Sequence, residues 1–225
     1  MTNPVEGHLR VTRTARYWSA GGGDEVEELW VVLHGYKQLA RRFLRRFEPI
    51  ADEGRWVVAP EGLSRFYTDP QPGRHGPASA VGASWMTRED RENEIQDYVA
   101  YLDQLREHLS RGASARLRVV VLGFSQGVAT ACRWLTRGRT RAHRLILWGD
   151  FLPPDLDLRE AAARLAGTDV VLVRGDTDAV LTDARLRAEE EARVSEGGIE
   201  LRLVTYPGGH EIDVGVLGML TDASP

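Results

Sequence analysis

Short runs of large apolar residues recur along the chain, and each ends near a glycine, an aspartate or a proline. The runs are continuous rather than alternating, as in the strands of a parallel sheet that helices cover on both faces. The pattern predicts such strands at residues 30–33, 56–59, 117–122, 145–148 and 170–173. Residues 199–206 alternate and predict a strand nearer one edge, while residues 9–18 predict an antiparallel strand at the other edge.

Between these runs, apolar residues recur at the 3.6-residue spacing of a helix. The spacing is found at Ile95, Tyr98, Val99, Leu102 and Leu105, and again at Val128, Ala131, Cys132 and Leu135. A further helix is predicted to begin after Asp157, because Glu160 follows it at the spacing of a capping box. Alternation of strands and helices favours right-handed βαβ units. We therefore predict a single α/β domain over residues 1–225, built on a mostly parallel, doubly wound sheet.

One segment, residues 63–84, interrupts this order. It has prolines at 70, 72 and 77 and glycines at 73, 76 and 82, so we expect an irregular loop. Loops of this length inside a compact domain are often functional. This one leaves the carboxyl end of the strand at 56–59, and in open α/β sheets ligands bind beyond such ends. The segment is therefore a candidate rim or flap for a site.

The pentapeptide Gly123-Phe124-Ser125-Gln126-Gly127 stands directly between a predicted strand and a predicted helix. In that place a G-x-S-x-G pattern is typical of a strained turn that exposes a nucleophilic serine. The backbone N–H of Gln126, in the first turn of the helix, would then face a developing oxyanion. A serine between glycines is also compatible with an ordinary turn, so the prediction of Ser125 as nucleophile depends on the flanking elements.

A serine hydroxyl needs a base that is oriented by a carboxylate, and both follow the pentapeptide. Asp178 comes just after the predicted strand at 170–173, and His210 lies in a glycine-rich turn after the last strand. The chain order Ser, Asp, His is that of an α/β-hydrolase arrangement. Two alternatives stay open: Asp176 and Asp183 stand close to Asp178 and an aspartate there also serves as a helix cap, and His210 would also suit a surface loop.

Composition and charge narrow the class of protein. Of the 225 residues, 42% are hydrophobic and 28% charged, which fits a soluble globular chain, and the net charge of −4 does not indicate nucleic-acid binding. Cys132 is the only cysteine, so no internal disulfide is expected. The first residues do not resemble a secretory leader, and no apolar run approaches the ~20 residues of a membrane helix. We expect a cytoplasmic protein without an integral membrane segment.

No group of His, Cys, Asp and Glu has the spacing of a metal site, so no metal is predicted. His34 precedes Gly35 in a turn at a strand end. We therefore predict that His34 is a packing or hydrogen-bonding residue rather than a second base. Cys132, on the helix that follows Ser125, is predicted to be a buried small hydrophobic residue and not a nucleophile.

These motifs together resemble the phospholipase/carboxylesterase family of α/β-hydrolases, which includes acyl-protein thioesterases. The resemblance is carried by Leu33-His34-Gly35-Tyr36, Gly123-Phe124-Ser125-Gln126-Gly127, the turn at 175–178 and Gly208-Gly209-His210-Glu211-Ile212. It implies an α/β-hydrolase fold without a large lid domain and a triad of Ser125, Asp178 and His210. It also implies a second oxyanion N–H at Tyr36 beside that of Gln126, and no cofactor.

The chain also departs from the family pattern. After His34-Gly35 it reads Tyr36-Lys37-Gln38, where the family often has x-Gly-Asp. The oxyanion loop is therefore expected to differ in shape, and Tyr36 brings a large ring to the site. Trp85 and Met86 stand where relatives often carry an aromatic pair near the substrate, which makes them candidate substrate contacts, with ordinary core packing as the alternative.

We therefore expect a serine hydrolase that cleaves small-molecule carboxylic esters or thioesters through an acyl-enzyme. One alternative keeps the triad but changes the bond, as in dienelactone, peptide or carbon–carbon hydrolysis. Another is a non-catalytic binding module on the same scaffold. The sequence predicts no particular oligomeric state.

Overall fold

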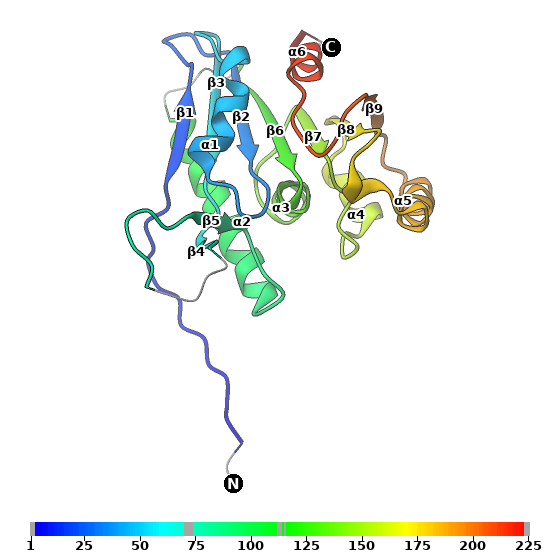
Figure 1. Cartoon of the computed structure of the whole chain (residues 1–225). Helices are drawn as coiled ribbons and strands as arrows, with labels where there is room; N and C mark the ends of the chain where they lie inside the picture. Colours follow the sequence, from blue (N-terminus) through cyan, green and yellow to red (C-terminus); the bar gives the residue numbers. More distant parts are fainter. Residues whose placement is uncertain (1–2, 70–73, 112–113, 115, 223–225) are drawn as a thin grey trace.

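The computed structural model describes residues 3–69, 74–111, 114 and 116–222. In this part of the chain, seven strands form one sheet in the order β1-β3-β2-β6-β7-β8-β9 (Figure 1). The strands are β1 (Tyr17–Ala20), β2 (Glu28–Leu33), β3 (Arg55–Pro60), β6 (Arg118–Phe124), β7 (Arg144–Trp148), β8 (Asp169–Gly175) and β9 (Arg202–Tyr206). β1 pairs antiparallel with β3, and the other pairs of neighbours are parallel. The predicted mostly parallel α/β sheet is confirmed.

Helices cover both faces of this sheet. They are α1 (Ala40–Leu44), the 3-10 helix η1 (Arg45–Ile50), α2 (Arg91–Leu109), α3 (Gln126–Arg137), α4 (Leu158–Arg164), the 3-10 helix η2 (Ala179–Leu181), α5 (Ala184–Gly197) and α6 (Val214–Asp222). One core cluster lies between the sheet and α2, α3 and α4, and a second lies between the sheet and α1, η1 and α6. As predicted, Asp157 caps α4, because its side chain accepts from the N–H groups of Arg159 and Glu160. Among the helices described, none combines the length and the apolar character needed to cross a bilayer.

The register of β2 explains why the predicted strands are apolar throughout. Leu29, Val31 and Leu33 belong to one core cluster, and Trp30 and Val32 belong to the other. Successive side chains of a strand point to opposite faces of the sheet, so both faces of β2 are buried. Full burial of a large aliphatic side chain contributes about 1.5–3 kcal/mol, which makes such central strands the most firmly held part of the fold.

The segment at 63–84 is more regular than expected. It contains a two-stranded antiparallel sheet of β4 (Ser64–Tyr67) and β5 (Val81–Ser84), with Ser64 opposite Ser84 and Tyr67 opposite Val81. The prediction of a wholly irregular loop is therefore wrong for these strands, which are too short to give a clear pattern. Residues 70–73, with two of the prolines used in that prediction, lie outside the described residues.

The N-terminal strand is shorter than the sequence pattern indicates. Residues 3–16 are neither helix nor strand, and Figure 1 shows this segment running away from the body of the molecule. β1 begins only at Tyr17, which lies opposite Pro60, the last residue of β3. Earlier residues have no further β3 residue with which to pair, so the apolar side chains at 9 and 11 remain exposed.

Candidate active site

Ser125 lies in a strained turn between β6 and α3, as the pentapeptide predicts. Its backbone has φ 53° and ψ −122°, a region that costs a residue other than glycine about 1–3 kcal/mol. The two flanking glycines permit the turn. A Cβ at Gly123 would lie 2.2 Å from Gly127 O, and a Cβ at Gly127 would lie 2.2 Å from Leu33 O. Any side chain at either position would push β6, α3 and β2 apart.

Asp178 and His210 form a hydrogen-bonded pair. Asp178 follows β8 and is 1% exposed, and its Oδ2 lies 2.9 Å from His210 Nδ1. Its Oδ1 accepts from the N–H of Val180, which holds the carboxylate at the start of η2. Since a carboxylate oxygen accepts, Nδ1 of His210 carries the ring proton and Nε2 keeps a lone pair that can accept another.

The two other aspartates of this region have different partners. Asp183 caps α5 through the N–H groups that follow it. Asp176 Oδ1 accepts from the N–H of Gly208 at 3.0 Å, so it holds the histidine loop against the loop that follows β8. Of the three aspartates, Asp178 is the one hydrogen-bonded to the His210 ring.

The His210 loop is fixed from inside the core by Tyr206, the last residue of β9. Tyr206 Oη lies 2.6 Å from Glu211 O and 2.9 Å from Gly209 O, and it accepts from Trp148 Nε1 at 3.2 Å. The His210 ring lies 4.8 Å from the Phe124 ring, between centroids, and Phe124 directly precedes Ser125. The imidazole is therefore held over the turn that carries the serine.

Four neighbouring strands, β6 to β9, bring the serine and the His–Asp pair together at their carboxyl ends. Ser125 N–H donates to Trp148 O at 2.9 Å, and a Cβ on the next residue, Gly149, would lie 3.3 Å from both Asp178 Oδ2 and His210 Nδ1. Within the described residues, Ser125 Oγ makes no hydrogen bond, and 31% of the His210 side chain is exposed. Ser125 and His210 are thus neighbours at the carboxyl ends of the strands, and no hydrogen bond joins them in the described residues.

The turn after β2 brings a second set of backbone N–H groups beside the serine. A Cβ at Gly35 would lie 3.1 Å from Ser125 Cβ. Gly35 N–H donates to Gln38 Oε1 at 2.9 Å, and Lys37 N–H donates to Ala83 O at 3.0 Å. Between them, the N–H of Tyr36 has no acceptor among the described residues. The N–H of Gln126 is also free of an intrahelical acceptor, because Gln126 is the first residue of α3.

The three predicted substrate contacts occupy different environments. The Tyr36 ring is 50% exposed and stacks on the Phe66 ring of β4, with centroids 5.4 Å apart. Trp85 is 1% exposed, and its Nε1 donates to His34 O, so its ring packs as a core residue. Met86 is partly buried, and its carbonyl accepts from Gln126 Nε2 at 2.9 Å. Tyr36 and Met86 are the two that remain available to a ligand.

His34 is a buried hydrogen-bonding residue, as expected from its position in the turn. It is fully buried, with Nδ1 2.8 Å from Gly35 O, and Nε2 accepts from the N–H of Gly62 at 3.0 Å. Burial lowers the pKa of His34, although the hydrogen bond to Gly35 O opposes this. The neutral ring therefore ties the turn after β2 to the residues that follow β3.

Asp150 is a titratable group at this edge that the sequence analysis did not single out. It follows Gly149, and its Oδ1 accepts from the N–H of Phe151 at 2.8 Å. Burial raises the pKa of the Asp150 carboxyl, and the Asp178 carboxylate adds to the rise while His210 opposes it. The sequence gives one sign of such a role: Asp150 follows the predicted strand at 145–148, which comes between the strands that precede Ser125 and Asp178.

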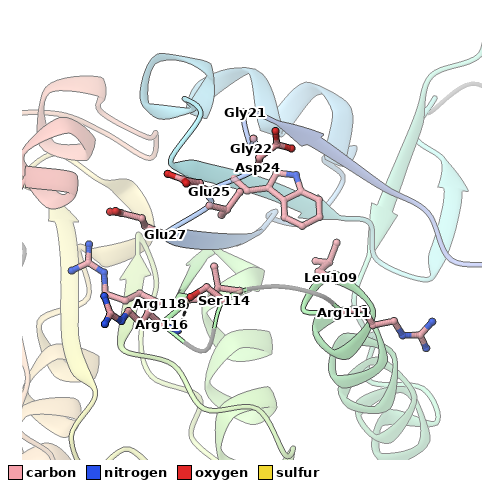
Figure 2. A pocket seen from close by; sticks show the side chains of 14 residues that line it. Gly21, Gly22, Asp24, Glu25, Glu27, Leu109, Arg111, Ser114, Arg116 and Arg118 are labelled. Carbon is pink, nitrogen blue, oxygen red and sulfur yellow. Dashed lines mark hydrogen bonds between the residues drawn. The ribbon is translucent and has the colours of Figure 1, made fainter.

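A cavity lies at the opposite end of the sheet (Figure 2). It has a volume of about 950 Å³ and is lined by residues at the amino ends of β2, β3 and β6, among them Glu27, Trp56 and Arg118. Asp24, Glu25 and Arg116 also line it, so charges of both signs surround the opening. Ser125, Asp178 and His210 do not line this cavity.

The potential metal ligands found in the described residues are exposed, and the cysteine is buried. In the described ranges, one group, Glu6, His8 and Asp90, places its ligand atoms within 4.8 Å of one another, and all three residues are exposed. Sequence spacing gave no sign of this group, because Asp90 is distant in the chain. Cys132 is 1% exposed, and burial raises the pKa of its thiol to about 12, so the thiol stays protonated.

A mostly parallel sheet, with a serine in a strained turn after one strand and a histidine–carboxylate pair beside it, defines an α/β-hydrolase. Comparison with protein families agrees: residues 21–222 match the model described as phospholipase/carboxylesterase. The chain therefore belongs to the phospholipase/carboxylesterase family and is a hydrolase. A comparison with curated proteins found no significant match.

Solved structures share the fold along nearly the whole chain. An acyl-protein thioesterase 2 from Zea mays is 18% identical, with 93% of this chain and 99% of that chain covered and a TM-score of 0.67. A carboxylesterase from Mesorhizobium loti is 19% identical, with 93% and 95% covered and a TM-score of 0.65. A phospholipase/carboxylesterase from Dyadobacter fermentans is 17% identical, with 96% and 99% covered and a TM-score of 0.60.

Proposed function

We propose that the protein hydrolyses small-molecule carboxylic esters or thioesters through an acyl-enzyme on Ser125. His210 Nε2 takes the proton of Ser125 Oγ as the oxygen attacks the acyl carbonyl carbon. The imidazolium then gives this proton to the leaving alcohol or thiol, and the acyl group stays on Ser125. Water, deprotonated by His210, releases the acid in the second half of the cycle. Asp178 keeps Nδ1 protonated and stabilises the imidazolium.

The oxyanion of each tetrahedral intermediate would be bound by the backbone N–H groups of Tyr36 and Gln126. Both flank Ser125, and neither donates to another backbone acceptor in the described part of the chain. Preorganised donors of this kind typically contribute a factor of about 10² to 10³ in kcat each. Neither this step nor the acyl transfer needs a cofactor or metal ion.

One observation carries the proposal: the 2.9 Å hydrogen bond between Asp178 Oδ2 and His210 Nδ1, next to a serine held at positive φ. Capping of η2 uses Oδ1 of Asp178, so it does not account for the hydrogen bond of Oδ2 to a partly exposed imidazole. Beside a strained serine, it supplies the base that the hydroxyl lacks.

The test is labelling with a fluorophosphonate probe, followed by initial rates on a substrate panel. We expect one adduct, on the peptide that contains Ser125, and none in Ser125→Ala. Nitrophenyl esters of increasing chain length, a thioester and an anilide of the same acid then define the bond. Ester or thioester turnover well above that of the anilide is expected. An adduct at another residue would refute the nucleophile, and comparable anilide turnover would refute the esterase assignment.

A further inference from the structure

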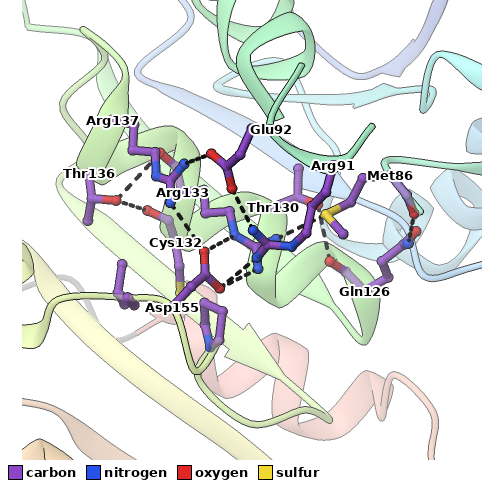
Figure 3. Close-up of polar contacts among 12 residues, drawn as sticks. Met86, Arg91, Glu92, Gln126, Thr130, Cys132, Arg133, Thr136, Arg137 and Asp155 are labelled. Atoms are coloured by element: carbon purple, nitrogen blue, oxygen red, sulfur yellow. Dashed lines mark hydrogen bonds and ion pairs between the residues drawn. The ribbon is translucent and has the colours of Figure 1, made fainter. Parts of the chain in front are cut away.

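A charged cluster joins α3 to the start of α2 and to the loop that follows β7 (Figure 3). Its centre is Asp155, which contacts Arg133 Nε at 3.1 Å and Nη2 at 2.7 Å. Arg91 and Arg137 also contact Asp155, at 2.9 Å and 3.2 Å. Burial would raise the pKa of the Asp155 carboxyl, but the hydrogen bonds and charges of Arg133 and Arg91 hold it well below its usual range. Asp155, the anchor of the cluster, is therefore charged at any ordinary assay pH.

From this anchor, Arg133 reaches the segment that follows β5. Arg133 lies about two turns of α3 beyond Ser125, and 6% of its side chain is exposed. Its third nitrogen, Nη1, donates to Met86 Sδ at 3.4 Å. A thioether is a weak acceptor, so this contact gives a buried guanidinium little stabilisation. Its clearer consequence is geometric, because it joins the Met86 side chain to α3.

The segment at 83–86 in turn contacts both sides of the proposed oxyanion hole. Met86 O accepts from Gln126 Nε2 at 2.9 Å, and Trp85 N–H donates to Gln126 Oε1 at 3.1 Å. At the other end of the segment, Ala83 O accepts from the N–H of Lys37, the neighbour of Tyr36. One short segment therefore contacts both the turn after β2 and the start of α3, and Arg133 contacts the last residue of this segment, Met86.

We propose that Arg133 is a positioning residue for the oxyanion hole, and that it acts by holding Met86 and the segment at 83–86 in place. The inference rests on the proposed function, because it concerns the same reaction. Oxyanion donors act on charge that develops in the transition state. Loss of the contact between Arg133 and Met86 therefore lowers kcat, while KM for a small ester stays nearly constant.

The first test compares Arg133→Met with Arg139→Met. Arg133→Met removes the charge, the ion pair with Asp155 and the contact with Met86. Arg139→Met removes only an exposed ion pair with Glu107, so it is the matched control. We expect kcat on nitrophenyl acetate to fall about tenfold or more in Arg133→Met, with KM within about twofold of wild type. The control should match wild type in both constants, and thermal unfolding shows whether each variant is folded at the assay temperature.

Removing one partner of a buried ion pair can unfold a protein, so Met86→Leu is the second variant. It keeps the Arg133–Asp155 pair and the apolar volume and removes only the sulfur acceptor. A lower kcat at unchanged KM and unchanged melting temperature is expected. Wild-type kcat in folded Arg133→Met, or in Met86→Leu if Arg133→Met does not fold, would overturn the inference. Failure of the proposed function looks different: wild type itself would then lack a fluorophosphonate adduct on Ser125.

Discussion

The two ends of the central sheet differ in what they offer to chemistry. At the amino ends of the strands, a cavity of about 950 Å³ is lined by charges of both signs, and one of them, Arg118, contacts Glu28 at 2.8 Å. At the carboxyl ends there is a serine at positive φ and a buried carboxylate whose partner is an imidazole. The ends are roughly 20 Å apart along β6. Backbone strain and an imidazole–carboxylate pair, rather than cavity volume, mark the candidate site.

Removing the nucleophile gives the largest expected effect. Ser125→Ala should lower kcat for ester hydrolysis by about 10⁵-fold or more, because the covalent path is lost while the oxyanion hole remains. Steady-state rates on nitrophenyl acetate, with the release of nitrophenol followed by absorbance, measure the loss. A variant with more than a tenth of wild-type activity would place the chemistry elsewhere in the molecule.

The imidazole partner comes next. Asp178→Asn should lower kcat by about 10⁴-fold, because an amide that donates to Nδ1 leaves the proton on Nε2, where it blocks the serine. Asp176→Asn is the matched control, since that side chain binds Gly208 N–H and not the His210 ring. If Asp176→Asn were the more damaging change, the assignment of Asp178 would be incorrect.

His34 makes the carboxyl end sensitive to acid. Its pKa is lowered by burial, so below about pH 6.5 the unfolded chain takes up a proton that the folded chain resists. The free energy of unfolding should therefore fall as pH drops from about 6.5, by up to about 1.4 kcal/mol per pH unit for this one group. Urea unfolding at several pH values measures this free energy. It should depend less steeply on pH in His34→Gln than in wild type. An identical pH dependence in the two proteins would mean that His34 does not contribute to the acid sensitivity. His108→Gln, at an exposed position, is the control.

The smallest effect is expected at the amino end. Arg116 lines the large cavity, and Arg116→Ala should leave kcat and KM for small esters within about twofold of wild type, as is usual for a surface change remote from the chemistry. The same nitrophenyl ester assay measures both constants. A change of tenfold or more in either constant would show that the cavity affects the reaction. The distinction between the two ends of the sheet would then be wrong.

Much of the fold could be predicted because buried parallel strands leave a strong local pattern. The run from 117 to 122 is apolar on both faces, so it indicates β6 without knowledge of its neighbours. The turn at Ser125 could be located because two glycines and a flanking strand constrain it. β4 and β5 have four residues each, too few to give such a pattern.

Contacts between distant segments could not be predicted. The choice among Asp176, Asp178 and Asp183 depends on which side chain faces His210, and that follows from the way the loops after β8 and β9 pack. The contact of Arg133 with Asp155 likewise depends on how α3 meets the loop after β7. A single sequence records which residues are present but not which loops converge.

The most direct test of a reactive serine at the carboxyl end is a rapid-mixing experiment with nitrophenyl acetate, followed by acid quench and peptide mapping. We predict a burst of nitrophenol close to one equivalent per enzyme, and a single acetyl group on the peptide that contains Ser125. A burst with the acetyl group on another residue, or hydrolysis that persists undiminished in Ser125→Ala, would contradict the account.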